Sequence, residues 1–151
     1  MTIKTLSKAL LLAGLLLPLF SAAESIRPFT SDGCSRFPNG TLEHAGLWLS
    51  CCEQHDLAYW RGGTYAERIA ADDALEVCVA ATGEPTIGLM MYFGVRLGGT
   101  PFAPTDFRWG YGWREYRGYR ALNEQEQQAV QEAMNAMDPE WRIRLMLPAP
   151  R

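Results

Sequence analysis

The chain has no apolar run long enough to cross a bilayer. The longest, Ala9–Phe20, has twelve residues, and a transmembrane helix needs roughly twenty. Lys4 and Lys8 precede this run and Ser21-Ala22-Ala23 follows it, which is the order of a secretory signal peptide. We therefore predict a signal peptide over 1–23 rather than a membrane anchor, with cleavage after Ala23 or alternatively Ala22. The mature chain, 24–151, is then exported, periplasmic or secreted, and has no transmembrane segment.

Lysine is absent after residue 8, so all twelve basic residues of this mature part are arginine. Without Lys4 and Lys8 the formal net charge falls from −3 to −5. The acidic excess lies in 24–76, with nine acidic residues and four arginines, whereas 77–151 holds eight of each. A nucleic-acid-binding protein normally shows the opposite bias, so we expect no nucleic-acid partner. Repeats are absent too, and the length suits a single domain over 24–151.

Cysteine is scarce, and its even count is informative. Cys34, Cys51, Cys52 and Cys78 all lie in the mature part, and four cysteines in an exported chain predict two disulfides. A bridge between the neighbours Cys51 and Cys52 would be strained, so two pairings remain, and both join Cys34 and Cys78 to the 51–52 step. Zinc binding by Cys51, Cys52 and His55 is the competing interpretation. It fits poorly, because the spacing is not that of a zinc finger or ribbon and the compartment is oxidising.

Helical signals dominate the mature chain and predict a small, disulfide-stapled, all-α domain. Thr64 with Glu67 and Asn123 with Glu126 each form a capping-box pattern at the start of a helix. The apolar segment 86–97 is expected to be a buried helix. The expected helices are 42–60, 64–81, 86–97 and 123–137; the expected loop or irregular segments are 24–41, 98–120, where short strands are the alternative, and the proline-rich tail.

Residues 51–78 carry the chemistry. Cys51, His55 and Tyr59 are spaced by four, so they share one face of the first helix. If the second helix returns antiparallel after the Gly62-Gly63 turn, the residue numbers of facing pairs have nearly constant sums. The sums for His55 with Asp72 (127) and for Cys51 with Cys78 (129) differ by two. One hairpin would therefore bring a carboxylate to the imidazole and a thiol to a thiol.

This arrangement suits acid–base chemistry. An imidazole can accept a proton from water near neutral pH, and a carboxylate on its second nitrogen fixes the tautomer and stabilises the imidazolium. Asp56 follows His55 by about 100° around the helix, so it points beside the ring. There it could hold a calcium ion with loop carbonyls, and calcium would polarise an ester carbonyl.

The segment CCEQHDLAY resembles the phospholipase A2 signature CCxxHDxxY. The resemblance covers about residues 32–78 and implies an antiparallel catalytic helix hairpin and a calcium-dependent hydrolase for lipid degradation. It makes His55 the general base, Asp56 a calcium ligand and Asp72, six residues before Cys78, the acid that orients His55. Tyr59 would hydrogen-bond Asp72. Asp73 competes with Asp72 as the partner, but its spacing to Cys78 fits less well.

The resemblance also implies the disulfides Cys51–Cys78 and Cys34–Cys52. It makes SDGCSRFPNG the calcium loop, with the carbonyls of Gly33, Ser35 and Phe37 as the ligands of one Ca²⁺ ion. The loop has no GxGG run, and the seventeen-residue gap from His55 to Asp72 is closer to short bacterial and fungal members than to animal ones. Residues 98–151 lie outside the resemblance.

Several residues have a purely structural alternative. Tyr59 could be a half-buried aromatic with its hydroxyl in water, and His44 is expected to be a surface or packing residue. The apolar helix over 86–97 could form an acyl-chain channel or a membrane-facing patch instead of core. We expect the aromatics of the next segment to hold a loop-rich region together rather than to form a lid or interfacial surface. These are Phe102, Phe107, Trp109, Tyr111, Trp113, Tyr116 and Tyr119.

Three functions are compatible with these residues. The first is hydrolysis of a phospholipid acyl ester by water activated at His55, with a phospholipid or membrane surface as the substrate. The second is a non-catalytic phospholipase A2-like module that binds lipid or protein. The third is a secreted structural or inhibitor domain in which the His–Asp pair only supports the hairpin. Retention of His55, Asp56 and Asp72 together favours the enzyme, because a scaffold has no need to bury two acids beside a histidine.

Overall fold

The computed structural model describes residues 25–148; the expected signal peptide and cleavage site, and residues 149–151 of the tail, lie outside them. Within this part of the chain there are five α-helices and no strand, which confirms the all-α class. No helix of this part is both long and apolar enough to cross a membrane. The helices are α1 (Leu49–Arg61), α2 (Tyr65–Ala81), α3 (Pro85–Gly98), α4 (Glu124–Asn135) and α5 (Pro139–Arg144).

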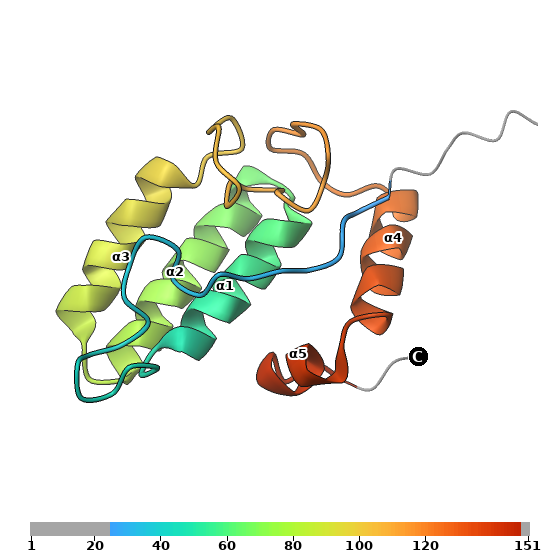
Figure 1. The fold of residues 1–151 in the computed structure, drawn as a ribbon. Helices are drawn as coiled ribbons and strands as arrows, with labels where there is room; N and C mark the ends of the chain where they lie inside the picture. Colours follow the sequence, from blue (N-terminus) through green and yellow to red (C-terminus); the bar gives the residue numbers. More distant parts are fainter. Residues whose placement is uncertain (1–24, 149–151) are drawn as a thin grey trace, which may run out of the picture.

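The first three helices lie side by side, with α2 in the middle (Figure 1). Short turns at 62–64 and 82–84 join them, so each helix reverses the direction of the one before it. The segment that precedes α1 crosses this layer on one side, and α4 and α5 lie beyond α1 (Figure 1). The layer brings residues of α1, α2 and α3 to a common point, where the candidate site lies.

Helix α1 begins at Leu49, not at residue 42 as the composition predicted. Residues 41–48 form turns instead: the amide of Thr41 donates to the carbonyl of His44, and the amide of His44 donates to the Thr41 hydroxyl. Gly40 packs so closely on this turn that a Cβ would lie 2.0 Å from the His44 carbonyl oxygen. These local hydrogen bonds of Thr41 stabilise a turn in place of the first turns of a helix, so α1 begins only at Leu49.

Both capping boxes are present. At α2 the Thr64 hydroxyl accepts from the Glu67 amide at 3.2 Å, and the Thr64 amide donates to the Glu67 carboxylate at 2.8 Å. Asn123 and Glu126 make the same pair of bonds at the start of α4. The expected last helix ends at Asn135, two residues early, and the short α5 that follows was not expected. Asp138 caps α5 through the amide of Glu140.

Two hydrophobic clusters lie on either side of α1. One, between α1, α2 and α3, surrounds the cysteines; the other joins the start of the described chain to the end of α1, to α4 and to α5. An ion pair between Arg144 of α5 and buried Glu53 of α1 also joins these two helices. The buried members of the first are Trp48, Cys51, Cys52, Leu75, Val79 and Met91, and those of the second are Ile26, Phe29, Trp60, Trp113, Val130, Met137 and Leu145.

Helix α3 is not the buried helix that its composition predicted. Only Gly88 and Met91 are buried. Helix α3 lies at the edge of the layer, and α2 is its neighbouring helix (Figure 1). Several large apolar side chains on its other sides are therefore exposed. The exposed ones are Leu89, Met90, Phe93 and Leu97.

Residues 99–123 form turns without a strand and pack on the end of α1. Trp109 and Trp113 are buried, and their indole N–H groups donate to the carbonyls of Gly63 and Arg61 at 2.9 and 2.8 Å. The predicted packing role is confirmed for these two tryptophans, whereas Phe102 and Tyr116 are exposed. The aromatic segment thus holds the turn between α1 and α2 in place, and with it the relative orientation of the two helices.

Candidate active site

The α1–α2 hairpin brings His55 to Asp72. The imidazole Nε2 lies 2.9 Å from Asp72 Oδ1, and both side chains are buried. Asp73, the competing partner, is exposed and makes no such contact, so that alternative is wrong. With Nε2 engaged, Nδ1 is the ring nitrogen without a hydrogen-bond partner among residues 25–148. His44, the other histidine, is exposed on the turn before α1.

Two disulfides fix the hairpin and the preceding loop. Cys51 of α1 is bonded to Cys78 of α2, and Cys34 of the loop is bonded to Cys52 of α1. This is the pairing that the phospholipase A2 resemblance implied. Because both cysteines beside His55 are in disulfides, neither can supply a thiolate, and the zinc interpretation of Cys51, Cys52 and His55 is wrong.

Tyr59 belongs to the same buried cluster. Its hydroxyl donates to Asp72 Oδ1 at 2.7 Å and accepts from Arg68 Nε at 3.0 Å. Burial, followed by the negative charge of Asp72, raises the pKa of Tyr59, so the hydroxyl stays protonated and remains a donor. Gly99 covers the ring so closely that a Cβ there would lie 2.5 Å from Tyr59 Cε1. The alternative of a hydroxyl in water is therefore wrong.

Two arginines that the sequence did not single out complete the surroundings of Asp72. Arg96 of α3 donates to Asp72 Oδ2 at 2.7 Å, and Arg68 Nε lies 3.7 Å from the same oxygen. Burial alone would raise the pKa of Asp72, but hydrogen bonds from His55, Arg96 and Tyr59 hold it below its usual value. Arg68 precedes Asp72 by four residues on one helix face, a spacing visible in the sequence. Arg96 gave no comparable signal.

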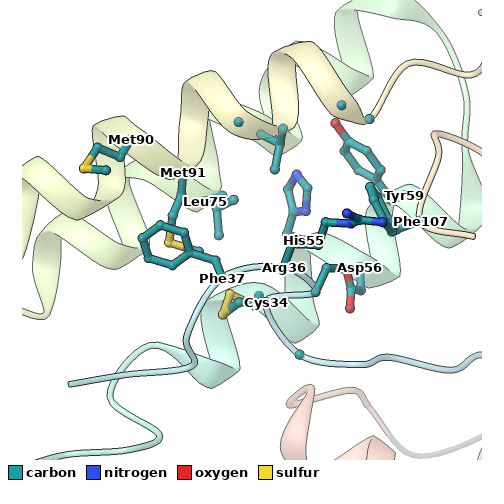
Figure 2. Close-up of a pocket in the computed structure, with 17 residues that line it drawn as sticks. Cys34, Arg36, Phe37, His55, Asp56, Tyr59, Leu75, Met90, Met91 and Phe107 are labelled. Atoms are coloured by element: carbon teal, nitrogen blue, oxygen red, sulfur yellow. A yellow bond between two sulfur atoms is a disulfide. The ribbon is translucent and has the colours of Figure 1, made fainter. Parts of the chain in front are cut away.

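An apolar cavity of about 260 Å³ adjoins His55. Figure 2 shows it between the loop bearing Phe37, the helix bearing Met90 and Met91, and His55. Arg36 extends along its wall. The imidazole of His55 therefore forms part of the wall of this apolar cavity. An apolar ligand in the cavity would lie against a potential proton acceptor.

Asp56 lies on the same cavity and also borders a second one, of about 310 Å³, together with Asp32 and Asp106. Its Oδ2 accepts from the Ser31 hydroxyl at 2.5 Å. Burial raises the pKa of Asp56 to about 7; the Ser31 hydrogen bond acts in the opposite direction, and Asp32 raises the pKa further. Unlike Asp72, it has no basic partner among residues 25–148. It is a buried acid that a cation would stabilise.

The loop expected to supply carbonyl ligands lies next to this acid. Gly33, Ser35 and Phe37 line the cavity that His55 and Asp56 line. Gly33 and Ser35 have φ values of +77° and +55°, so the chain turns sharply around Cys34. In the described part of the chain, no cluster of three or more His, Cys, Asp or Glu side chains could hold a metal ion. A cation at Asp56 would thus depend on backbone oxygens.

Known proteins give no further guidance: the chain matches no protein-family model, no curated protein and no solved structure.

Proposed function

We propose that the protein is a phospholipase A2-type carboxylic ester hydrolase, which releases a fatty acid from phospholipid with water as the nucleophile. The observation that carries the proposal is the position of His55. It is held by Asp72 on one ring nitrogen, and it lies on the wall of an apolar cavity. An acyl chain in that cavity would bring its ester to an imidazole that is already oriented.

The chain's own groups account for the proton transfers. Asp72 accepts the Nε2–H hydrogen bond, which leaves Nδ1 as the base. As the water oxygen bonds to the ester carbonyl carbon, Nδ1 takes the water's proton, and Asp72 stabilises the imidazolium. The C–O bond to the glycerol oxygen then breaks, and the proton passes from Nδ1 to that oxygen. The products are a fatty acid and a lysophospholipid.

Calcium fits the residues beside His55. Asp56 is a buried carboxylate without a basic partner in the described part of the chain. The other nearby donors are the oxygens of the 33–37 loop, which are hard ligands of the kind that calcium prefers. Asp56 and the carbonyls of Gly33, Ser35 and Phe37 would hold it. Once bound, calcium would polarise the ester carbonyl and stabilise the negative charge that develops on its oxygen.

The exposed apolar face of α3 supports a lipid substrate. Met90, Gly94 and Gly98 line the cavity, while Leu89, Phe93 and Leu97 of the same helix face solvent. Large apolar side chains in solvent beside a cavity mark a surface that binds something apolar. A lipid surface on this face would deliver acyl chains directly to the cavity that contains His55.

A non-catalytic lipid-binding module is the second candidate. The hydrogen bond from Ser31 favours it, because it occupies one of the two Asp56 oxygens that a cation would need. Such a module would retain the cavity and the apolar face but would not release fatty acid.

One assay separates the two functions. The exported, processed chain is incubated with phospholipid vesicles in calcium or in chelator, beside His55→Gln. His44→Gln is the matched control, because His44 is the other histidine and is exposed. We expect calcium-dependent release of fatty acid by the wild type and by His44→Gln, and none by His55→Gln. Binding of vesicles without release under any condition would support the binding module instead.

A further inference from the structure

The site is built around one buried carboxylate of α2 that links this helix to α1 and α3. Asp72 of α2 is fully buried, with His55 and Tyr59 of α1 on its Oδ1 and Arg96 of α3 on its Oδ2. Arg68, on the same helix as Asp72, lies 3.7 Å away and donates its hydrogen bonds elsewhere. Arg96 is thus the only arginine of residues 25–148 with a direct hydrogen bond to Asp72.

We propose that Arg96 is a positioning residue for the reaction, which keeps Asp72 ionised and so keeps His55 in the tautomer that can act as a base. This inference rests on the proposed function, but its first test does not require turnover. A buried carboxylate that loses a directly bonded charge takes up a proton more readily, and the charge that remains near Asp72, Arg68 Nε, lies 3.7 Å away. A protonated Asp72 would be neutral and therefore a weaker acceptor for the hydrogen bonds of His55 and Tyr59 at its Oδ1, so the Nε2–H form of His55 would lose its preference.

The geometry assigns separate roles to the two arginines. Arg68 holds the framework: it donates to the hydroxyls of Tyr59 and Tyr119 and to the carbonyls of Val95 and Arg96. The hydrogen bonds from its side chain to these two carbonyls hold the end of α3 in place, and this part of α3 carries Arg96. Arg96 supplies the short charged contact, in which both partners are ionised and the hydrogen bond is correspondingly strong.

Arg96 has a second partner, which provides a matched control. Its Nη2 donates to the hydroxyl of Tyr65 at 2.9 Å, and its guanidinium lies over the Tyr65 ring. If Arg96 served only to attach α3 to α2, loss of the Tyr65 hydroxyl would weaken the same attachment. If its role is exerted through Asp72, Tyr65→Phe leaves that role intact.

The first test measures the tautomer of His55 by nitrogen NMR in wild type, Arg96→Gln, Arg96→Lys and Tyr65→Phe, at a pH where the ring is neutral. His44→Gln in every sample leaves a single imidazole to observe. We expect the Nε2–H form in wild type, Arg96→Lys and Tyr65→Phe, and a mixture or the Nδ1–H form in Arg96→Gln. An unchanged Nε2–H spectrum in Arg96→Gln would overturn the proposal.

The second test is kinetic, on phospholipid vesicles with calcium. We expect kcat to fall roughly 10- to 100-fold in Arg96→Gln, the loss of one hydrogen bond to a charged group. KM should change little, and Arg96→Lys should recover most of kcat. An equal loss in Arg96→Lys or Tyr65→Phe would indicate attachment of α3 only and would contradict the proposal. If the wild type shows no activity, the proposed function fails, and the tautomer alone decides the role of Arg96.

Discussion

His55 Nε2 and Asp72 Oδ1 lie 2.9 Å apart, although seventeen residues and a helix reversal separate them in the chain. The contact exists because α1 and α2 are antiparallel and are bonded to each other through Cys51 and Cys78. The covalent link and the His–Asp contact lie on the same helix face, one turn apart. The hairpin therefore determines the orientation of the imidazole, and the predictions below follow from it.

Replacing Asp72 by Asn should lower kcat by roughly 100- to 10,000-fold, the range of a general base whose tautomer and charge are no longer controlled. The amide can donate to Nε2, which leaves the wrong nitrogen protonated. Fatty-acid release from vesicles is the measurement. Asp73→Asn is the matched control, since Asp73 is one residue further along α2 and exposed, and it should retain wild-type rates. Comparable losses in both variants would show that the His55–Asp72 contact has no special role.

The bond between Cys51 and Cys78 should contribute more to stability than its loop length alone suggests. It closes 27 residues, and the bond between Cys34 and Cys52 closes 18. The chain-entropy model gives about 3 to 4 kcal/mol for each, with a difference of only a few tenths. The Cys51→Ala/Cys78→Ala variant also loses the covalent link between α1 and α2, whereas the Cys34→Ala/Cys52→Ala variant releases only a loop from α1. Chemical denaturation should therefore show the larger loss in the Cys51→Ala/Cys78→Ala variant, and the reverse order would contradict the expected role of the hairpin.

The exposed apolar face of α3 should bind vesicles. We expect Phe93→Asp/Leu97→Asp to weaken vesicle binding by tenfold or more, because burial of even one such side chain contributes about 1.5–3 kcal/mol. The melting temperature should not fall, since both side chains are exposed. Co-sedimentation with vesicles is the measurement. Ile143→Asp, at an exposed position on α5, is the control, and an equal loss there would mean that α3 is not the binding face.

Acid should destabilise the protein partly through Glu126. Burial would raise its pKa, but hydrogen bonds and ion pairs with the Asn123 amide, Arg117 and Arg120 hold the pKa below its usual value. A carboxyl whose pKa is lower in the folded state stabilises the fold above its unfolded pKa and loses that contribution as pH falls through the folded pKa. The free energy of unfolding should thus decline on acidification below about pH 4.5. The decline should be shallower in Glu126→Gln, and parallel curves would refute this assignment.

The His–Asp contact was predictable because it depends on two local rules. Helical periodicity puts Cys51, His55 and Tyr59 on one face, and a short glycine turn reverses the chain. Together they determine which residues of α2 can face them. A third local rule, the capping box, predicted the starts of α2 and α4, since Thr64 pairs with Glu67 and Asn123 with Glu126 three residues later.

The contribution of α3 was not predictable in this way. A helix that is apolar over most of its surface does not indicate which side its neighbour covers, so the exposure of Phe93 and Leu97 and the approach of Arg96 to Asp72 remained hidden. Both depend on the packing of α3 against α2. The start of α1 was predicted too early for a related reason: residues 41–48 form a turn through hydrogen bonds between Thr41 and His44, and the turn leaves no room for a Cβ at Gly40. Composition does not reveal this packing.

Hydrolysis in ¹⁸O-labelled water tests the central claim most directly. The wild-type chain is incubated in labelled water with phospholipid vesicles and calcium. Mass spectrometry then gives the masses of the products, and the same measurement is made for His55→Gln. We predict one ¹⁸O atom in the released fatty acid, none in the lysophospholipid, and no product from His55→Gln. Absence of fatty acid from the wild type, or an equal labelled yield from His55→Gln, would contradict a reaction in which His55 activates water.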